Sequence, residues 1–165
     1  MSNPSITVRN ALFGDLPSIH RLEKTSFSDP YPYSLLFNLL LRNPETFIVA
    51  QFEGDIVAYA ISSIGEGDIG HVVSIAVLPS LRRRGIASML MDVLEKKMVD
   101  AGARIFSLEV SEDNLSARNL YAKRGYLPKA LLKSYYSTGK AAIRMEKRIW
   151  KSDTGAYSDP PPKTS

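Results

Sequence analysis

The stretch from residue 70 to residue 88 constrains the fold more than any other part of this 165-residue chain. Residues 71–78 (HVVSIAVL) form an apolar run rich in branched side chains, which is typical of a buried β-strand. A Pro-Ser turn follows, then RRRGIA at residues 82–87, where a helix should begin. Free backbone N–H groups and the positive end of a helix converge at such a turn, and arginines add charge-assisted hydrogen bonds. The segment is therefore predicted to bind a phosphate-bearing molecule.

The composition narrows the chemistry that the chain can perform. With 44% hydrophobic and 23% charged residues it is an ordinary globular protein. No apolar run approaches the ~18 residues of a membrane span and no signal-peptide pattern is present, so we expect a cytoplasmic protein. The absence of cysteine excludes disulfides, thiolate metal ligands and a cysteine nucleophile. Because His20 and His71 are the only histidines, no metal site is expected, and group transfer should be direct or use an oxygen or amine nucleophile.

The net charge of +4 favours anionic partners such as a nucleotide cofactor or a ribosome surface. No DNA- or RNA-reading motif is visible, and the aromatic residues do not alternate with the basic ones. We therefore expect no specific nucleic-acid partner and no membrane partner.

Hydrophobic periodicity and turn residues divide residues 6–149 into strands and helices. The expected elements are a strand at 6–9, a helix capped by Asp15 and ending near Ser26, a short helix at 35–41, strands at 47–52, 56–64 and 71–78, a helix from Ile86 to about Ala101, a strand at 105–110, a helix capped by Asn114 and ending at Gly125, and strands at 126–136 and 141–149. Hairpins mix with strand–helix–strand crossovers, so an α/β fold is predicted, with a mixed sheet and helices on both faces. Residues 1–150 should form a single domain, and the polar, Pro-rich residues 151–165 a disordered tail.

Two motifs coincide in the second half of the chain. R-x-x-G-x-A occurs at residues 82–87 directly after a strand, and N-x-x-A-x-x-L-Y-x-x-x-G-Y follows at residues 114–126. In this order and spacing, the pair strongly resembles the GNAT superfamily of acetyl-CoA-dependent N-acetyltransferases, over about residues 6–149. The segments HVVSIAV, LEVSEDN and SYYSTG are similar to the Ard1- and RimI-type protein N-terminal acetyltransferases. This resemblance implies a twisted, mostly antiparallel GNAT sheet of about seven strands.

The resemblance also implies a cofactor and a reaction. Acetyl-CoA would donate its acetyl group to the N-terminal amine of proteins or peptides, ribosomal proteins and nascent chains among them, by direct attack in a ternary complex. That family often has an acidic pair after its tyrosines and glycine, where this chain has Lys140-Ala141-Ala142. The departure leaves the acceptor preference open.

The cofactor residues come from both motifs. The turn and the first helical residues would cradle the pyrophosphate, with Gly85 letting the backbone approach closely. By resemblance, the preceding strand would bind the pantetheine arm through its backbone, and an N–H near Val77 would polarise the thioester carbonyl. Asn114 would contact the cofactor or simply cap its helix. The expected cofactor-binding residues are Ile75, Ala76, Val77, Arg82, Arg83, Arg84, Gly85, Ile86, Ala87, Ser88, Asn114 and Tyr121.

Four residues are candidates for proton transfer. Tyr121, within the second motif, is the expected general acid for the departing thiolate. Glu109 alternates with apolar neighbours on its strand, and by resemblance it is the base, acting through water. His71 and Asp29 are further candidates for the base, with structural roles as their alternatives. A base is required because an α-amino group has a pKa of about 8 and is mainly protonated at neutral pH.

The acceptor is less sharply defined than the cofactor. By resemblance, the peptide would be bound by Asp29, Tyr31, His71, Tyr135 and Tyr136. A lysine side chain would cost about 3 kcal/mol more to deprotonate than an α-amine, which agrees with an α-amine acceptor. The alternatives are a lysine or small-amine acetyltransferase, and a catalytically silent acyl-CoA-binding subunit that docks on a partner.

Overall fold

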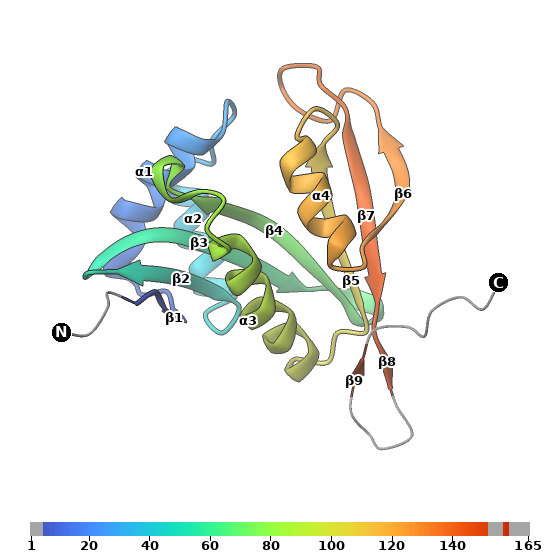
Figure 1. The fold of residues 1–165 in the computed structure, drawn as a ribbon, viewed down its shortest axis with the longest axis horizontal. Helices are drawn as coiled ribbons and strands as arrows, with labels where there is room; N and C mark the ends of the chain where they lie inside the picture. The colour runs from blue at the N-terminus through green and yellow to red at the C-terminus, as the bar shows by residue number, and fades with distance from the viewer. Residues whose placement is uncertain (1–4, 152–156, 159–165) are drawn as a thin grey trace. The chain divides into compact units, whose positions relative to one another are not determined.

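The structure, a computed structural model, describes residues 5–151 and 157–158 (Figure 1). Its main sheet is open, mostly antiparallel and has seven strands in the order β1-β2-β3-β4-β5-β7-β6. The principal elements are β1 (Thr7–Asn10), α1 (Leu16–Ser26), α2 (Tyr33–Arg42), β2 (Phe47–Phe52), β3 (Asp55–Ile64), β4 (Ile69–Val77), α3 (Ile86–Asp100), β5 (Ile105–Ser111), α4 (Leu115–Lys123), β6 (Leu127–Leu132) and β7 (Ala142–Arg148). This order of strands and helices is the one expected from the sequence.

The chain divides into two compact units. The first comprises the residues through Ser63 together with Val72–Met98, and the second comprises Ile64–His71 and the residues from Val99 onward. Strand β4 contributes its first three residues to the second unit and the rest to the first. The single domain expected over residues 1–150 stays a prediction.

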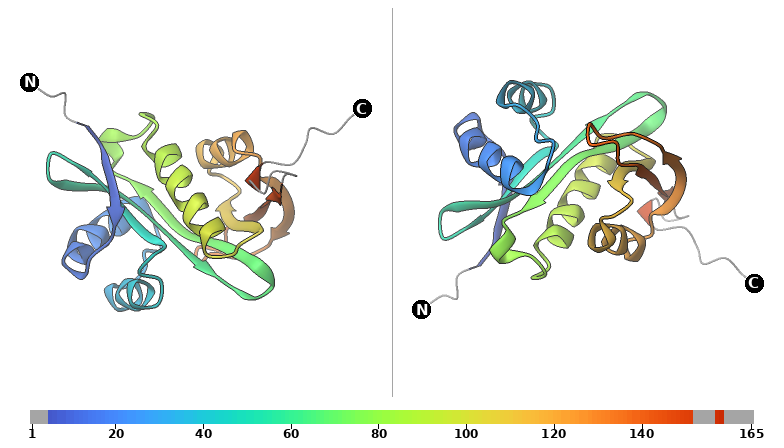
Figure 2. Two further views of the ribbon diagram at one scale, coloured as in Figure 1. Left: turned by 90° about the horizontal axis from the view of Figure 1, so that it is seen from below. Right: turned by 90° about the horizontal axis from the view of Figure 1, so that it is seen from above.

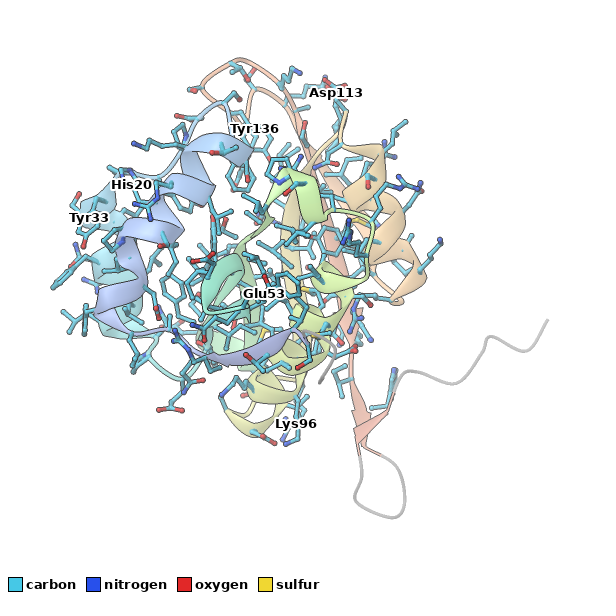
Figure 3. All side chains as sticks on the ribbon, turned by 60° about the vertical axis from the view of Figure 1, so that its left-hand side comes forward. His20, Tyr33, Glu53, Lys96, Asp113 and Tyr136 are labelled. Carbon is cyan, nitrogen blue, oxygen red and sulfur yellow. The ribbon has the colours of Figure 1, made fainter. Side chains whose placement is uncertain are left out.

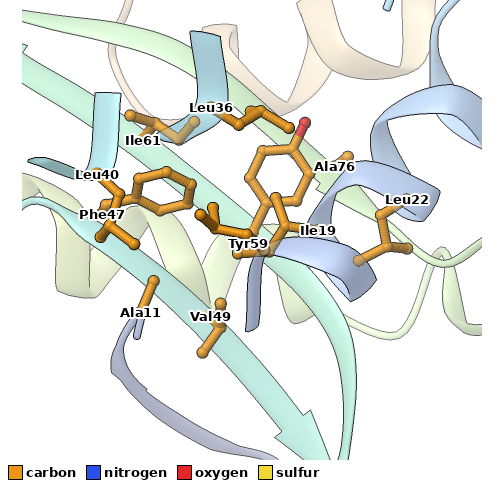
Figure 4. Packing of buried hydrophobic residues seen from close by; sticks show 11 residues of the cluster. Ala11, Ile19, Leu22, Leu36, Leu40, Phe47, Val49, Tyr59, Ile61 and Ala76 are labelled. Carbon is orange, nitrogen blue, oxygen red and sulfur yellow. The ribbon is translucent and has the colours of Figure 1, made fainter. Parts of the chain in front are cut away.

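The first unit carries helices on both faces of its strands. In the antiparallel pair β2–β3, Phe47 lies opposite Ile61 and Val49 opposite Tyr59. These four side chains are fully buried, and they form one cluster with apolar residues of α1 and α2 (Figure 4). The intervening residue Ile48 is also fully buried, and α3 lies over the face opposite α1 and α2 (Figure 2). Because β2 is buried on both faces, its sequence is a continuous apolar run without the alternation of a half-exposed strand.

The start of α1 corrects one detail of the sequence analysis. Asp15 occupies the N-cap position as expected, but its side chain makes no capping hydrogen bond. Its carboxylate instead accepts two hydrogen bonds from Arg9 at 2.7 and 2.9 Å, and one from the Leu12 N–H at 2.8 Å. The Arg9 guanidinium accordingly holds the pKa of Asp15 below its ordinary value. Asp15 therefore ties β1 to the helix start rather than capping the helix.

The second unit is built on β5, β7 and β6, which pair antiparallel in that order, and on α4. The sequence predicted a strand from 126 to 136, whereas β6 ends at Leu132. The strand stops because Ser134 takes a left-handed conformation at φ 51°, which interrupts an extended chain. A turn follows, in which the Tyr136 N–H donates to the Lys140 carbonyl at 3.1 Å.

Residues 151–165 were expected to be a disordered tail. Within that range the structure describes Lys151 and Tyr157–Ser158, where the two-residue strands β8 (Trp150–Lys151) and β9 (Tyr157–Ser158) pair antiparallel. The rest of the expected tail lies outside the described residues.

Candidate active site

The turn between β4 and α3 has the backbone geometry of an anion cradle. Arg83 and Gly85 both take left-handed conformations, with φ of 61° and 78°. Such a φ is uncommon for a residue with a Cβ, and it is typical of functional turns. The two left-handed residues turn the chain sharply into the helix that begins at Ile86, where the free N–H groups of the first turn and the positive end of the helix dipole are available to an anion. A Cβ on Gly85 would meet nothing within 4 Å, so the conformation, and not crowding, calls for glycine there.

The three arginines of this turn divide into two kinds. The Arg82 Nε donates to the Val77 carbonyl at 3.1 Å, and its Nη2 lies 3.5 Å from the Ser26 hydroxyl. Arg83 and Arg84 are exposed, and within the described residues their side chains make no hydrogen bond or ion pair. Arg82 therefore anchors the turn to the end of β4, while the charges of Arg83 and Arg84 stay available to a phosphate.

The preceding strand segment, Ile75–Val77, belongs to the first unit and is largely covered. Ala76 is 6% exposed and Val77 8% exposed, so their side chains pack in the core. A ligand could be bound here only through backbone N–H and C=O groups. The role of this segment toward a pantetheine arm stays a prediction. The residues of the turn and strand fit a ligand with a diphosphate and an extended amide chain.

In the second unit, the structure brings His71 and Glu109 together. The His71 Nε2 lies 2.6 Å from the Glu109 Oε2, and the Arg144 Nε donates to the Glu109 Oε1 at 3.2 Å. Arg144 stands directly opposite Glu109 in the β5–β7 pair. The Glu109 side chain is 11% exposed, whereas that of His71 is 39% exposed. The bond to His71, with a smaller contribution from Arg144, holds the pKa of Glu109 below its ordinary value, so this carboxylate is ionised at neutral pH.

Three tyrosines belong to the same unit. Tyr135 is nearly half exposed, and burial together with the charge of Glu109 raises its pKa. The ring of Tyr135 meets that of Tyr136 edge-on, with the centroids 5.0 Å apart. Tyr121 is 5% exposed, and burial, with Tyr136 as a second cause, raises its pKa. The Tyr121 hydroxyl donates no hydrogen bond to the described part of the chain.

The Asn114 side chain caps α4, one of the two roles expected of it. Its Oδ1 accepts a hydrogen bond from the Ala117 N–H at 3.1 Å. The sequence alone could not separate this role from cofactor contact, because both use the same amide.

Changing Asn114 to alanine is expected to lower the free energy of unfolding by about 1 kcal/mol, the usual cost of a lost N-cap. Asn114→Ser should keep most of that stability, since serine caps helices well. Chemical denaturation measures both variants. If capping is the main role, the Kd for acetyl-CoA stays within about twofold of wild type. A tenfold rise in that Kd for the alanine variant would instead assign Asn114 to the cofactor.

The loop between α1 and α2 carries Asp29 and Tyr31 in the first unit. Asp29 is exposed and makes no hydrogen bond or ion pair with any described residue. Tyr31 packs against the buried cluster. Just after the loop, the ring of Tyr33 meets that of His20 of α1 edge-on, with ring centroids 5.8 Å apart (Figure 3).

Sequence reasoning missed two polar groups. Arg144, the second partner of Glu109, is found only once the β5–β7 register is known. Glu23 is 2% exposed and accepts hydrogen bonds from the Tyr31 N–H, at 2.9 Å, and from the Tyr59 hydroxyl. A signal for Glu23 did exist, because it occupies a position on the apolar stripe of α1, where a carboxylate is out of place.

Comparison with known proteins identifies the family. A helix start with free N–H groups can bind a phosphorylated donor, and a histidine–carboxylate pair can accept a proton. Together these features are typical of a group-transfer enzyme. Residues 15–126 match the acetyltransferase (GNAT) family, and the chain belongs to it. Members of this family use acetyl-CoA, so the protein is an acetyl-CoA-dependent N-acetyltransferase.

Individual relatives cover most of the chain. An uncharacterized N-acetyltransferase of Methanocaldococcus jannaschii is 36% identical over 135 residues, covering 81% of this chain and 86% of its own. An N-alpha-acetyltransferase of Saccharolobus solfataricus is 34% identical over 155 residues, covering 87% of this chain and 93% of its own. The crystal structure of Ard1 from Thermoplasma volcanium superposes with a TM-score of 0.85 at 29% identity, covering 88% of this chain and 98% of the Ard1 chain. The GNAT fold expected from the motifs is thereby confirmed.

The expected location was cytoplasmic. Among the described residues, no helix combines the length and apolar character needed to cross a bilayer. The compartment itself stays a prediction.

Proposed function

We propose that the protein transfers the acetyl group of acetyl-CoA to the N-terminal amine of proteins or peptides. The observation that carries the proposal is the bond between His71 and Glu109, with the imidazole as the more exposed partner. Relatives named N-alpha-acetyltransferase, at 33–34% identity, support this choice of acceptor. Acetyl-CoA supplies a thioester whose carbonyl is attacked directly by the neutral amine, with CoA leaving as a thiolate.

His71 is the group that we assign to remove the proton from the amine. The pKa of Glu109 is lowered, so this carboxylate alone is a weak base at neutral pH. As a partner that accepts from the imidazole, it fixes the ring and stabilises the cation that forms on it. Arg144 makes a smaller contribution than His71 to the lowered pKa of the carboxylate. This assignment moves Glu109, the base in the sequence analysis, into an orienting role.

Tyr121 is assigned to the leaving thiolate. An ordinary phenol has a pKa of about 10 and a thiol about 8.5, so complete proton transfer from tyrosine to a free thiolate is uphill. The raised pKa of Tyr121 increases that cost. Tyr121 therefore acts chiefly as a hydrogen-bond donor to the developing thiolate, and the proton moves fully only when the thiolate is itself desolvated.

Different segments of the chain are assigned to bind the cofactor and the acceptor. We assign the β4–α3 turn to the pyrophosphate, with its backbone and the charges of Arg83 and Arg84. We assign the α1–α2 loop, including Asp29 and Tyr31, and the tyrosines Tyr135 and Tyr136 to the acceptor peptide. The proposed partners are protein N-termini, with ribosomal proteins and nascent chains as candidates.

The test is mass spectrometry after incubation with acetyl-CoA and a peptide library. Each peptide carries an internal lysine and is present with a free and with a blocked N-terminus. Label confined to free α-amines is the expected result, and it would also give the preference for the first residue. Label on the lysines of blocked peptides would move the protein to the side-chain class. An absence of label with acetyl-CoA still bound would overturn the proposal in favour of a small amine or a silent subunit.

A further inference from the structure

Glu23 is a buried carboxyl group that the proposed reaction does not use. It is 2% exposed, and in the described part of the chain it pairs with no lysine or arginine. Burial raises the pKa of this carboxyl, because the charged form loses its hydration. An apolar residue at this place in α1 would bury its surface without that cost. The carboxyl must therefore do something that packing alone does not.

The hydrogen bonds of Glu23 connect three segments of the first unit. Its Oε1 accepts from the backbone N–H of Tyr31 at 2.9 Å, in the α1–α2 loop. Its other oxygen accepts from the hydroxyl of Tyr59, which is fully buried on β3. The Tyr59 hydroxyl also lies at hydrogen-bonding distance, 3.1 Å, from the Ser74 Oγ on β4. Figure 4 shows Tyr59 among the apolar residues of the cluster, with its hydroxyl at the end of the ring.

The two ends of this chain of hydrogen bonds lie at segments that the proposed function assigns to the two substrates. One end is the backbone of the loop that carries Asp29 and Tyr31. The other end is Ser74, which directly precedes the Ile75–Val77 segment of β4. A backbone N–H held by a buried carboxylate is restrained in position, because a hydrogen bond to a charged acceptor is stronger than one to a neutral acceptor.

We propose that Glu23 is a positioning residue, which ties the α1–α2 loop to strand β4 through Tyr59 and Ser74 and thereby sets the loop for the acceptor. The inference rests on the proposed function, in which this loop receives the acceptor and β4 the pantetheine arm. Glu23 touches neither substrate. It acts through the Tyr31 backbone, so its loss should weaken the binding of the acceptor and leave acetyl-CoA binding unchanged.

The decisive variants are Glu23→Leu, Glu23→Gln and Thr46→Val. Leucine fills the space but cannot accept the Tyr31 N–H, whereas glutamine keeps an acceptor oxygen for that N–H and a donor for the Tyr59 oxygen. Thr46 is the matched control, since it is 6% exposed in the same unit and its Oγ1 donates to the Ser62 carbonyl at 2.6 Å, away from the loop. Removing its hydroxyl leaves the Ser62 carbonyl without this donor, so it also lowers stability.

Two readouts separate positioning from mere stability. Losing a hydrogen bond to a charged group should speed amide exchange at Tyr31 in Glu23→Leu by about tenfold or more. The KM for the acceptor should rise by about tenfold, with kcat and the KM for acetyl-CoA within about twofold. Glu23→Gln should restore both readouts to within about threefold, and Thr46→Val should leave both unchanged.

An unchanged acceptor KM in Glu23→Leu, or an equal rise in Thr46→Val, would overturn the inference. If Glu23→Leu does not fold, Tyr59→Phe keeps the ring and cuts the link to β4, and the acceptor KM should then rise by about threefold. Amide exchange at Tyr31 needs no acceptor, so it tests the tether even if the protein acetylates no α-amine. In that case the proposed function fails, and the acceptor KM is measured with the amine that is acetylated.

Discussion

Changing His71 to alanine is expected to lower kcat by about 100-fold or more, the usual contribution of a positioned proton acceptor. The KM for acetyl-CoA should change little, because His71 belongs to the proton-transfer pair and not to the phosphate turn. In the variant the acid limb of the pH–rate profile should follow the pKa of the acceptor amine, about 8, because the amine then has to lose its proton to water. Steady-state kinetics over a range of pH with a peptide acceptor measures both effects.

The assignment of separate roles to His71 and Glu109 has its own test. If Glu109 orients the imidazole, Glu109→Gln should also lower kcat, and the double variant should be little worse than His71→Ala alone. Multiplicative losses would mean that the two residues act independently. A His71→Ala enzyme with nearly normal kcat, beside an inactive Glu109→Gln enzyme, would return the role of base to Glu109 acting through water. His20→Ala, which removes the other histidine, is the matched control and should stay within about twofold of wild type.

Local signals in the sequence predicted the fold closely, for identifiable reasons. The β2–β3 hairpin was placed correctly because a Glu-Gly-Asp turn separates two runs whose side chains are buried, and Gly54 there takes a φ of 90°. The end of β6 was missed because nothing in the composition marks Ser134 as a residue that adopts a left-handed conformation. The role of Asp15 was misjudged because Arg9, its partner, lies on a separate element. One error therefore concerns the conformation of a single residue, and the other a side-chain partner on a neighbouring element.

For the candidate site, too, local sequence patterns were found, whereas contacts between residues far apart in the sequence were not. The R-x-x-G-x-A turn is contiguous in sequence, so the local pattern was sufficient to place a turn between β4 and α3, while its role toward the cofactor stays a prediction. His71 and Glu109 were each singled out, but their hydrogen bond spans 38 residues and depends on strand pairing. Glu23 was not singled out, because its partner Tyr59 lies 36 residues away in sequence. A carboxylate on an apolar stripe is a usable signal, and it indicates that a buried polar partner must exist elsewhere.

Changing Gly85 to valine should raise the Kd for acetyl-CoA by about tenfold or more. A β-branched residue at φ 78° is strained by roughly 1–2 kcal/mol, so the turn would relax away from the conformation that aligns its N–H groups. The new side chain would also stand in open space beside the turn, where a Cβ meets no other atom within 4 Å and a diphosphate can approach. Isothermal titration with acetyl-CoA gives the Kd directly.

Gly54→Val is the control that separates strain from binding. Gly54 has a φ of 90° and an equally open surrounding, but it lies in the β2–β3 hairpin. Both variants should lose similar stability in chemical denaturation, because both force a branched residue into the left-handed region. Only Gly85→Val should weaken acetyl-CoA binding. Equal losses of affinity in the two variants would mean that general destabilisation, and not the geometry of the turn, controls the cofactor. Unchanged affinity in Gly85→Val would transfer pyrophosphate binding from the backbone of the turn to the side chains of Arg83 and Arg84.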